Sequence, residues 1–186
     1  MPSSNKPMIL ESELKIELLK PEHSELVTSF SCGEEDEDLF LKKDALANQN
    51  LKLSETYLLF EQSRPNIISY ITLTLGSFKL SPNKELDGIV IRDKSVGIYT
   101  NNMPCMFIGK LATDKEEIKR GAGKYLIKFA IKKAIELNEI FPLPFVALHA
   151  YPAKVSYYEE LGFRIAFTPS TPDPETITMY LHLFEE

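Results

Sequence analysis

The chain has 186 residues, of which 44% are hydrophobic and 26% charged, a composition ordinary for one globular domain. It has no apolar run of the roughly 18 residues that a membrane span needs, and no signal-peptide core, so we expect a cytoplasmic protein without membrane contact. Its formal net charge of −6 argues against a partner with a long phosphate backbone, without excluding a local basic patch.

The first half of the chain predicts a strand, two helices and a hairpin. Leu14 to Leu19 alternates apolar and polar residues as a strand does, and Pro21 suits the first turn of a short helix. A second helix is expected from about Glu34 to Asn50, because its acidic start faces the positive end of the helix dipole. Two alternating strands, Thr56 to Glu61 and Ile67 to Leu75, are joined by turn residues and predict an antiparallel pair.

The second half alternates strands with helices. Residues 79 to 104 are polar and punctuated by proline and glycine, which favours an irregular excursion with a short strand at Gly88 to Arg92. Met106 to Thr113 then predicts a strand, and a charged turn leads to an amphipathic helix ending near Asn138. The remaining expected elements are strand 145–149, helix 153–161 stopped at Gly162, a strand from 163, and strand 176–184.

Two cysteines limit the chemistry of the chain. Cys32 and Cys105 are too few for a disulfide framework and lack the spacing of metal ligands. We therefore expect two buried free thiols and no metal.

The turn before the helix from residue 121 is suited to an anion. The first amides of a helix lack intrahelical partners, and Gly121 and Gly123 let a bulky anion approach the backbone. Lys119, Arg120 and Lys124 add positive charge. A mononucleotide loop is excluded by the spacing, and Leu126 stands where a dinucleotide fingerprint has its third glycine.

Two motifs in order resemble the GNAT superfamily of acetyltransferases. Ile118-Lys119-Arg120-Gly121-Ala122-Gly123 is similar to the family's Gln/Arg-x-x-Gly-x-Gly/Ala turn, except that Ile118 replaces its first residue. Tyr157-Tyr158-Glu159-Glu160-Leu161-Gly162-Phe163 is similar to the Phe-Tyr-Glu-x-x-Gly-Phe signature. The resemblance implies an α/β (α+β) fold with a mixed, mostly antiparallel sheet of six or seven strands and about four helices, strands four and five being splayed. It implies one domain over residues 14–186, after a flexible segment over 1–13.

The resemblance also implies acetyl-CoA as co-substrate, in the gap where strands four and five diverge. The implied cofactor-binding residues are Leu111, Ala112, Thr113, Lys119, Arg120, Gly121, Ala122, Gly123 and Lys124. Tyr158 is the implied general acid for the departing thiolate. Asp114, Glu116, Glu117 and His149 stay open as the general base. Tyr151 stands where many relatives carry a cofactor-contacting asparagine, so a contact there is not implied.

A narrower likeness concerns one branch of the superfamily. Phe30-Ser31-Cys32-Gly33 and Gly109-Lys110-Leu111-Ala112-Thr113-Asp114 are similar to the branch that includes bacterial toxin–antitoxin acetyltransferases, which modify the amino group of aminoacyl-tRNA. Because this chain is acidic, we expect an N-acetyltransferase acting on the primary amine of another acceptor. The alternatives are a toxin acting on aminoacyl-tRNA and a catalytically silent CoA-binding module. The resemblance also admits a homodimer.

Overall fold

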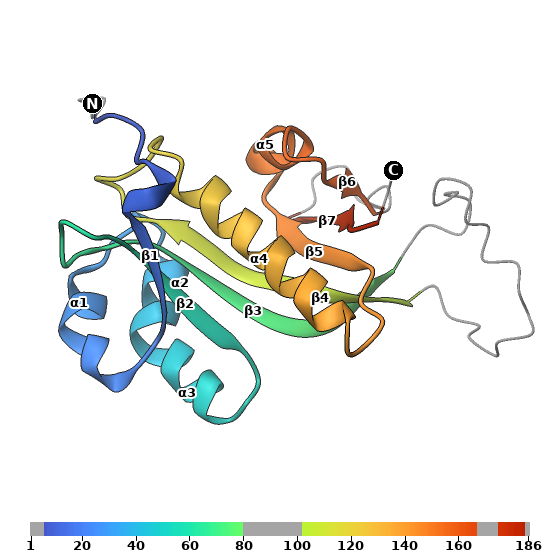
Figure 1. Ribbon diagram of the computed structural model, residues 1–186, viewed down its shortest axis with the longest axis horizontal. Helices are drawn as coiled ribbons and strands as arrows, with labels where there is room; N and C mark the ends of the chain where they lie inside the picture. Colours follow the sequence, from blue (N-terminus) through green and yellow to red (C-terminus); the bar gives the residue numbers. More distant parts are fainter. Residues whose placement is uncertain (1–5, 80–101, 167–174, 185–186) are drawn as a thin grey trace, which may run out of the picture. The chain divides into compact units, whose positions relative to one another are not determined.

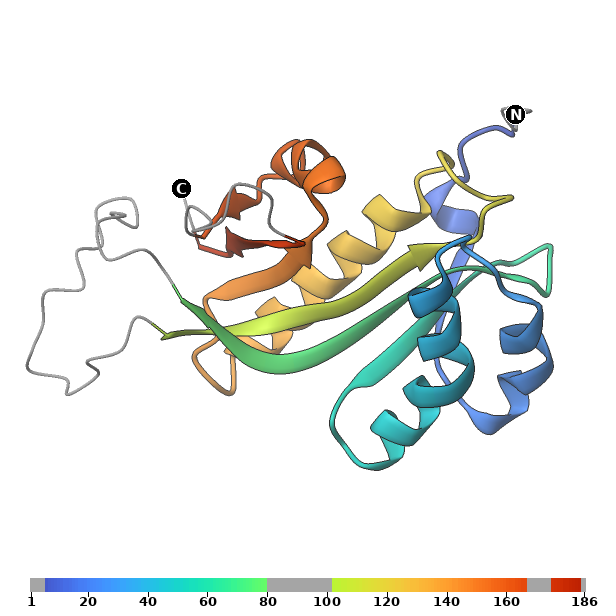
Figure 2. The ribbon, with the colours of Figure 1, turned by 180° about the vertical axis from the view of Figure 1, so that it is seen from behind.

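The computed structural model describes residues 6–79, 102–166 and 175–184. Within them, one seven-stranded sheet has the order β1-β2-β3-β4-β5-β7-β6 (Figures 1 and 2). The pairs β1–β2, β2–β3, β5–β7 and β6–β7 are antiparallel, and β5 follows β4 through helix α4, the crossover that a parallel pair needs. The strands are β1 (Leu14–Leu18), β2 (Glu55–Glu61), β3 (Ile67–Lys79), β4 (Asn102–Thr113), β5 (Phe145–Ala150), β6 (Arg164–Ile165) and β7 (Ile177–His182).

The described helices follow the predicted order, with more subdivision. They are α1 (Ser24–Ser29), α2 (Glu35–Leu39), a π-helical segment (Phe40–Asp44), α3 (Ala45–Asn50), α4 (Ala122–Asn138) and α5 (Val155–Glu159). Short 3-10 turns precede β1, α1 and α5 at Glu11–Glu13, Pro21–His23 and Pro152–Lys154. Because α2, the π segment and α3 follow one another without a break, they form the single helical stretch expected from about Glu34 to Asn50. The mixed sheet and its helices confirm the predicted fold class.

The strands flanking residues 80–101 are longer than predicted. β3 continues to Lys79 and β4 begins at Asn102, so the expectation of irregular structure from 79 to 104 is wrong at both ends. Met103 and Cys105 are buried while Pro104 is exposed, an alternation that the proline and polar residues hide in the sequence. The short strand expected at Gly88 to Arg92 lies outside the described residues.

The chain divides into two compact units, which are described separately. The first unit comprises residues 1–74 and 108–133. Its core joins Leu58, Phe60 and Tyr70 of the hairpin to Leu41 and Ala45 of the helical stretch. On the other face of β2, Tyr57 packs edge-on against Phe129 of α4, with ring centroids 4.8 Å apart. Helices therefore cover both faces of this part of the sheet.

The second unit comprises residues 75–107 and 134–186. Its core is aromatic: Phe78 of β3 stacks on Tyr180 of β7 at 5.2 Å and meets Phe145 of β5 edge-on at 5.4 Å. Cys105 is fully buried in this core, as predicted, and burial raises the pKa of its thiol to about 12. Cys32, in the first unit, is only half-buried, so the expectation of two buried thiols is wrong for that residue.

Candidate functional site

The turn between β4 and α4 is held by its own backbone and by Asp114. The Asp114 carboxylate accepts hydrogen bonds from the amides of Glu116 at 2.9 Å and Ser31 at 3.2 Å. Farther along, Lys119 and Gly121 adopt left-handed φ values of +64° and +89°. The turn is therefore a fixed, partly strained conformation and not an extended loop.

The first turn of α4 presents backbone amides. The first helical hydrogen bond runs from Tyr125 N to Gly121 O at 3.0 Å. The amides of Ala122, Gly123 and Lys124 come before it in the chain and therefore have no acceptor within the helix. Lys119 and Lys124 are exposed beside them. Ile118, where the family carries Gln or Arg, is 47% exposed and offers no hydrogen-bond donor in its side chain. These groups suit a pyrophosphate, and their assignment to one stays a prediction.

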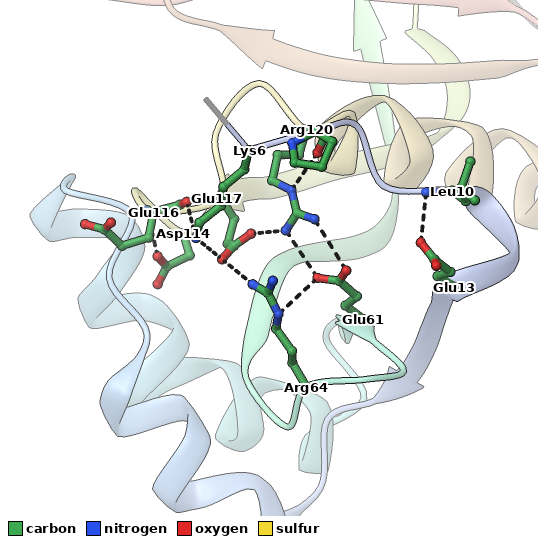
Figure 3. Close-up of polar contacts among 10 residues, drawn as sticks. Lys6, Leu10, Glu13, Glu61, Arg64, Asp114, Glu116, Glu117 and Arg120 are labelled. Atoms are coloured by element: carbon green, nitrogen blue, oxygen red, sulfur yellow. Dashed lines mark hydrogen bonds and ion pairs between the residues drawn. The ribbon is translucent and has the colours of Figure 1, made fainter. Parts of the chain in front are cut away.

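Arg120 lies in the same turn, but its side chain is buried in an ion cluster (Figure 3). Its guanidinium bonds Glu117 and lies 3.2 Å from Glu61 at the end of β2. Arg64 joins the cluster through Glu61 at 3.7 Å and Glu117 at 3.6 Å. The positive charge of Arg120 is therefore neutralised inside the protein, and only its backbone remains for an anion at the turn.

The backbone groups at the end of β4 alternate between the side of β3 and the opposite side. The amide of Asp114, one residue beyond β4, donates to Ile68 O of β3 at 3.0 Å. Because successive strand residues direct their backbone groups to alternate sides, those of Leu111 and Thr113 point away from β3. Ala112 O accepts a hydrogen bond from Ser69 Oγ of β3 at 2.7 Å. The contact of Leu111, Ala112 and Thr113 with a pantetheine arm stays a prediction.

Tyr158 belongs to the second unit, on α5. The helix ends in a Schellman motif: Gly162, at φ +89°, donates to Glu159 O at 2.9 Å, and Phe163 donates to Tyr158 O at 3.0 Å. Gly162 is therefore the predicted C-cap. Burial, with a smaller contribution from Tyr157, raises the pKa of Tyr158 to about 12. The phenol thus keeps its proton throughout the physiological pH range.

His149 is the penultimate residue of β5, in the same unit. Its ring meets Phe107 edge-on at 4.8 Å, and its Nδ1 lies 3.0 Å from Thr178 Oγ1. Although His149 is exposed at the surface, partial desolvation of its ring lowers the pKa of His149 below 6.5, so the imidazole is neutral at neutral pH. A neutral imidazole is the form that accepts a proton. Tyr151, two residues farther on, is 48% exposed.

The three carboxylates considered as general bases differ in their surroundings. Asp114 binds two backbone amides, and Glu117 lies in the ion cluster with Arg120 and Lys6. Both are engaged in holding the turn. Glu116 is exposed, and its backbone carbonyl accepts a hydrogen bond from Lys6 Nζ at 2.9 Å. His149 and Glu116 are thus the two candidates whose side chains can accept a proton and have no ion-pair partner among the described contacts.

The described residues contain no group of three or more metal-ligating side chains placed to hold an ion. Across the same ranges, every helix is too short or too polar to traverse a bilayer.

No family model matches the chain. It is 28% identical over 143 residues to a tRNA-acetylating toxin of Mycobacterium tuberculosis, covering 76% of this chain and 80% of that protein. A Tyr→Phe mutant of the AtaT toxin, solved with the C-terminus of its antitoxin AtaR and acetyl-CoA, superposes with a TM-score of 0.70 at 21% identity, over 92% of this chain and 94% of that one. AtaT complexed with acetyl-methionyl-tRNAfMet superposes with a TM-score of 0.69 at 22% identity, over 89% and 93%. The chain therefore has the fold of the GNAT acetyltransferases and is similar, in sequence and in structure, to the toxins among them.

Proposed function

We propose that this protein is an acetyl-CoA-dependent acetyltransferase that acetylates the amino group of an aminoacyl-tRNA. The acetyl-transfer part rests on the amide-presenting turn before α4 together with the protonated Tyr158. The choice of acceptor rests on the similarity to the tRNA-acetylating toxin and to AtaT complexed with acetyl-methionyl-tRNAfMet. Our sequence expectation of another primary-amine acceptor is less well supported than its alternative.

Acetyl-CoA would be held by backbone groups more than by side chains. The amides of Ala122, Gly123 and Lys124 would receive the pyrophosphate, with Lys119 and Lys124 adding charge. The outward-facing backbone of Leu111 and Thr113 would pair with the pantetheine arm, as a neighbouring strand would. Arg120 would contribute through its backbone alone, since its guanidinium is bound to Glu61 and Glu117.

The transfer requires two proton movements. The neutral amine attacks the thioester carbonyl carbon, a C–N bond forms, and the C–S bond breaks to release the CoA thiolate. Tyr158 would give its proton to that thiolate, which a neutral phenol within hydrogen-bond reach can do. The proton lost by the amine would pass to His149, directly or through water, because the neutral imidazole accepts protons at neutral pH.

The net charge of −6 does not exclude tRNA, because an acidic protein can still carry a local basic patch. The ion cluster does not supply such a patch, since Arg120, Arg64 and Lys6 are paired there with Glu61 and Glu117. Exposed lysines line α4 at positions 124, 128 and 132, and Lys128 is paired with Glu11 at 2.7 Å. Clustering of Lys79, Lys84, Arg92 and Lys94 beside the site would favour tRNA. Lys79 is exposed at the end of β3, and the other three lie outside the described residues.

The acceptor can be tested with purified protein, labelled acetyl-CoA and total aminoacylated tRNA. We expect label in the tRNA fraction, released by mild alkali as N-acetyl-amino acid. Deacylated tRNA should stay unlabelled, because it lacks the amino group. Labelling of small amines or peptides alone, with charged tRNA inert, would disprove the acceptor and leave the acetyltransferase. Acetyl-CoA binding without any transfer would indicate a silent binding module.

Two further parts of the proposal follow from the relatives. AtaT is solved with the antitoxin AtaR, so we propose that a cognate antitoxin binds this chain. A cytoplasmic location, where charged tRNA is found, and a homodimer stay predictions. Co-expression with the product of an adjacent gene, followed by gel filtration, tests the antitoxin.

A further inference from the structure

We propose that an N-terminal segment, Lys6–Ile9, and the buried cluster of Arg120, Glu61 and Glu117 position the turn before α4 for acetyl-CoA. These side chains would act without contacting the cofactor. The inference rests on the proposed function, because it assumes that the turn binds the CoA pyrophosphate. It adds residues that neither GNAT motif contains: Lys6, Pro7, Met8, Ile9, Glu61 and Glu117.

Arg120 is held from three directions at once. Its side chain is 4% exposed, and its guanidinium faces Glu117 within the turn and Glu61 on β2 (Figure 3). Its Nε donates to Pro7 O at 2.9 Å. One side chain thereby joins the turn, the sheet and the N-terminal segment, with every nitrogen aimed at an acceptor.

The N-terminal segment lies along the same turn. Ile9 N donates to Arg120 O at 3.2 Å, so backbone and side chain of Arg120 are both fixed by this segment. Lys6 Nζ pairs with Glu117 at 2.7 Å. A Cβ placed on Gly121 would lie 2.7 Å from the Met8 methyl, which shows how closely Met8 covers that glycine. The segment that the sequence led us to regard as flexible is bound here from Lys6 onward.

These contacts surround the strained part of the turn. Arg120 stands between Lys119 and Gly121, the two residues with left-handed φ values. A lysine in that region persists only where its surroundings over-determine it. The cluster and the segment supply those constraints, and the amides of α4 begin at the next residue, Ala122. Loosening the constraints should let the amides leave the geometry that an anion requires.

The test measures the dissociation constant of CoA by titration calorimetry, which needs no knowledge of the acceptor. Met8→Ala and Lys6→Gln alter side chains that are exposed or partly exposed, so both variants should fold. We expect each to weaken CoA binding roughly three- to tenfold, because Lys6→Gln loses the ion pair with Glu117 and Met8→Ala loses the cover over Gly121. Leu10→Ala is the matched control: Leu10 is 64% exposed, close to Met8 at 65%, and should bind CoA as the wild type does.

A second measurement separates positioning from general stability. CoA should slow hydrogen exchange at the Ile9 amide in the wild type, because coupling between segment and site is reciprocal. Arg120→Lys keeps the charge but loses the hydrogen bond from Nε to Pro7 O. This variant should bind CoA more weakly than the wild type at temperatures where the variant is fully folded. Unchanged CoA affinity in Met8→Ala and Lys6→Gln, with no protection of Ile9, would overturn the inference even if Arg120→Lys fails to fold. A wild type that binds no CoA would instead overturn the proposed function itself.

Discussion

Tyr158 and Tyr157 are adjacent on α5, and their surroundings differ. Tyr157 is 38% exposed, whereas Tyr158 is half-buried between the rings of Tyr157 and Phe163, at 5.2 and 5.8 Å. We expect Tyr158→Phe to lower kcat by about 100-fold, the usual contribution of a general acid, while CoA affinity is kept. The neighbouring Tyr157→Phe is the control and should retain activity. Equal losses in the two variants would assign the effect to packing.

Glu117 provides a test of the ion cluster through pH. Burial raises its pKa, but hydrogen bonds from Lys6 and Arg120 outweigh that effect and hold the pKa below 4.5. A carboxylate with a lowered folded-state pKa stabilises the fold above its unfolded-state pKa and loses that contribution as the pH falls through the folded value. Glu117→Gln should therefore cost about 2 kcal/mol in urea unfolding at pH 7, and clearly less at pH 3.5. A cost independent of pH would contradict the assigned ionic role.

At the scale of elements, replacing either of the two glycines around the start of α4 by alanine should change the stability of the protein, in opposite directions. Gly121 has φ +89°, so Gly121→Ala should destabilise the protein by about 1–2 kcal/mol. Gly123 lies within α4 at a helical conformation, where alanine should stabilise by up to about 1 kcal/mol. Chemical denaturation of both variants measures the difference. Equal effects of the same sign would show that the turn relaxes when Gly121 is replaced.

Helix α4 also allows a test of whether the charge of Lys124 contributes to CoA binding. Lys124 is exposed in its first turn, where glutamate is compatible with the helix dipole, so Lys124→Glu should fold normally. Reversing the charge beside the proposed pyrophosphate site should raise the dissociation constant of CoA at least tenfold. Lys132→Glu makes the same change two turns along the exposed stripe and should leave CoA affinity near that of the wild type. Similar losses in both would point to a long-range charge effect.

The elements that the sequence predicted are those with local signals. Three such signals depend only on neighbours in the chain. They are the helical spacing of apolar residues in α4, the glycine that ends α5, and the alternation of apolar and polar residues in the hairpin strands. The burial of Arg120 had no such signal, because its partners Glu61 and Pro7 are 59 and 113 residues away. A positive residue beside Gly121 is consistent with an anion contact, and only the three-dimensional contacts show that its charge is already satisfied. The π segment at Phe40–Asp44 was missed for a related reason, since its residues also suit an α-helix.

At the scale of the whole molecule, an acidic protein that acts on tRNA should make few phosphate contacts. Each contact releases counterions, so affinity for tRNA falls with salt in proportion to their number. For about two contacts, we expect the KM for charged tRNA to rise roughly tenfold between 50 and 200 mM salt. Initial rates with labelled acetyl-CoA measure this rise. The kcat at saturating tRNA should change little, because salt screens the charges that bring tRNA to the enzyme and does not change proton donation by the neutral phenol of Tyr158. A KM that does not vary with salt would indicate that the acceptor is recognised only at its aminoacyl end, and would favour a small amine as the natural substrate.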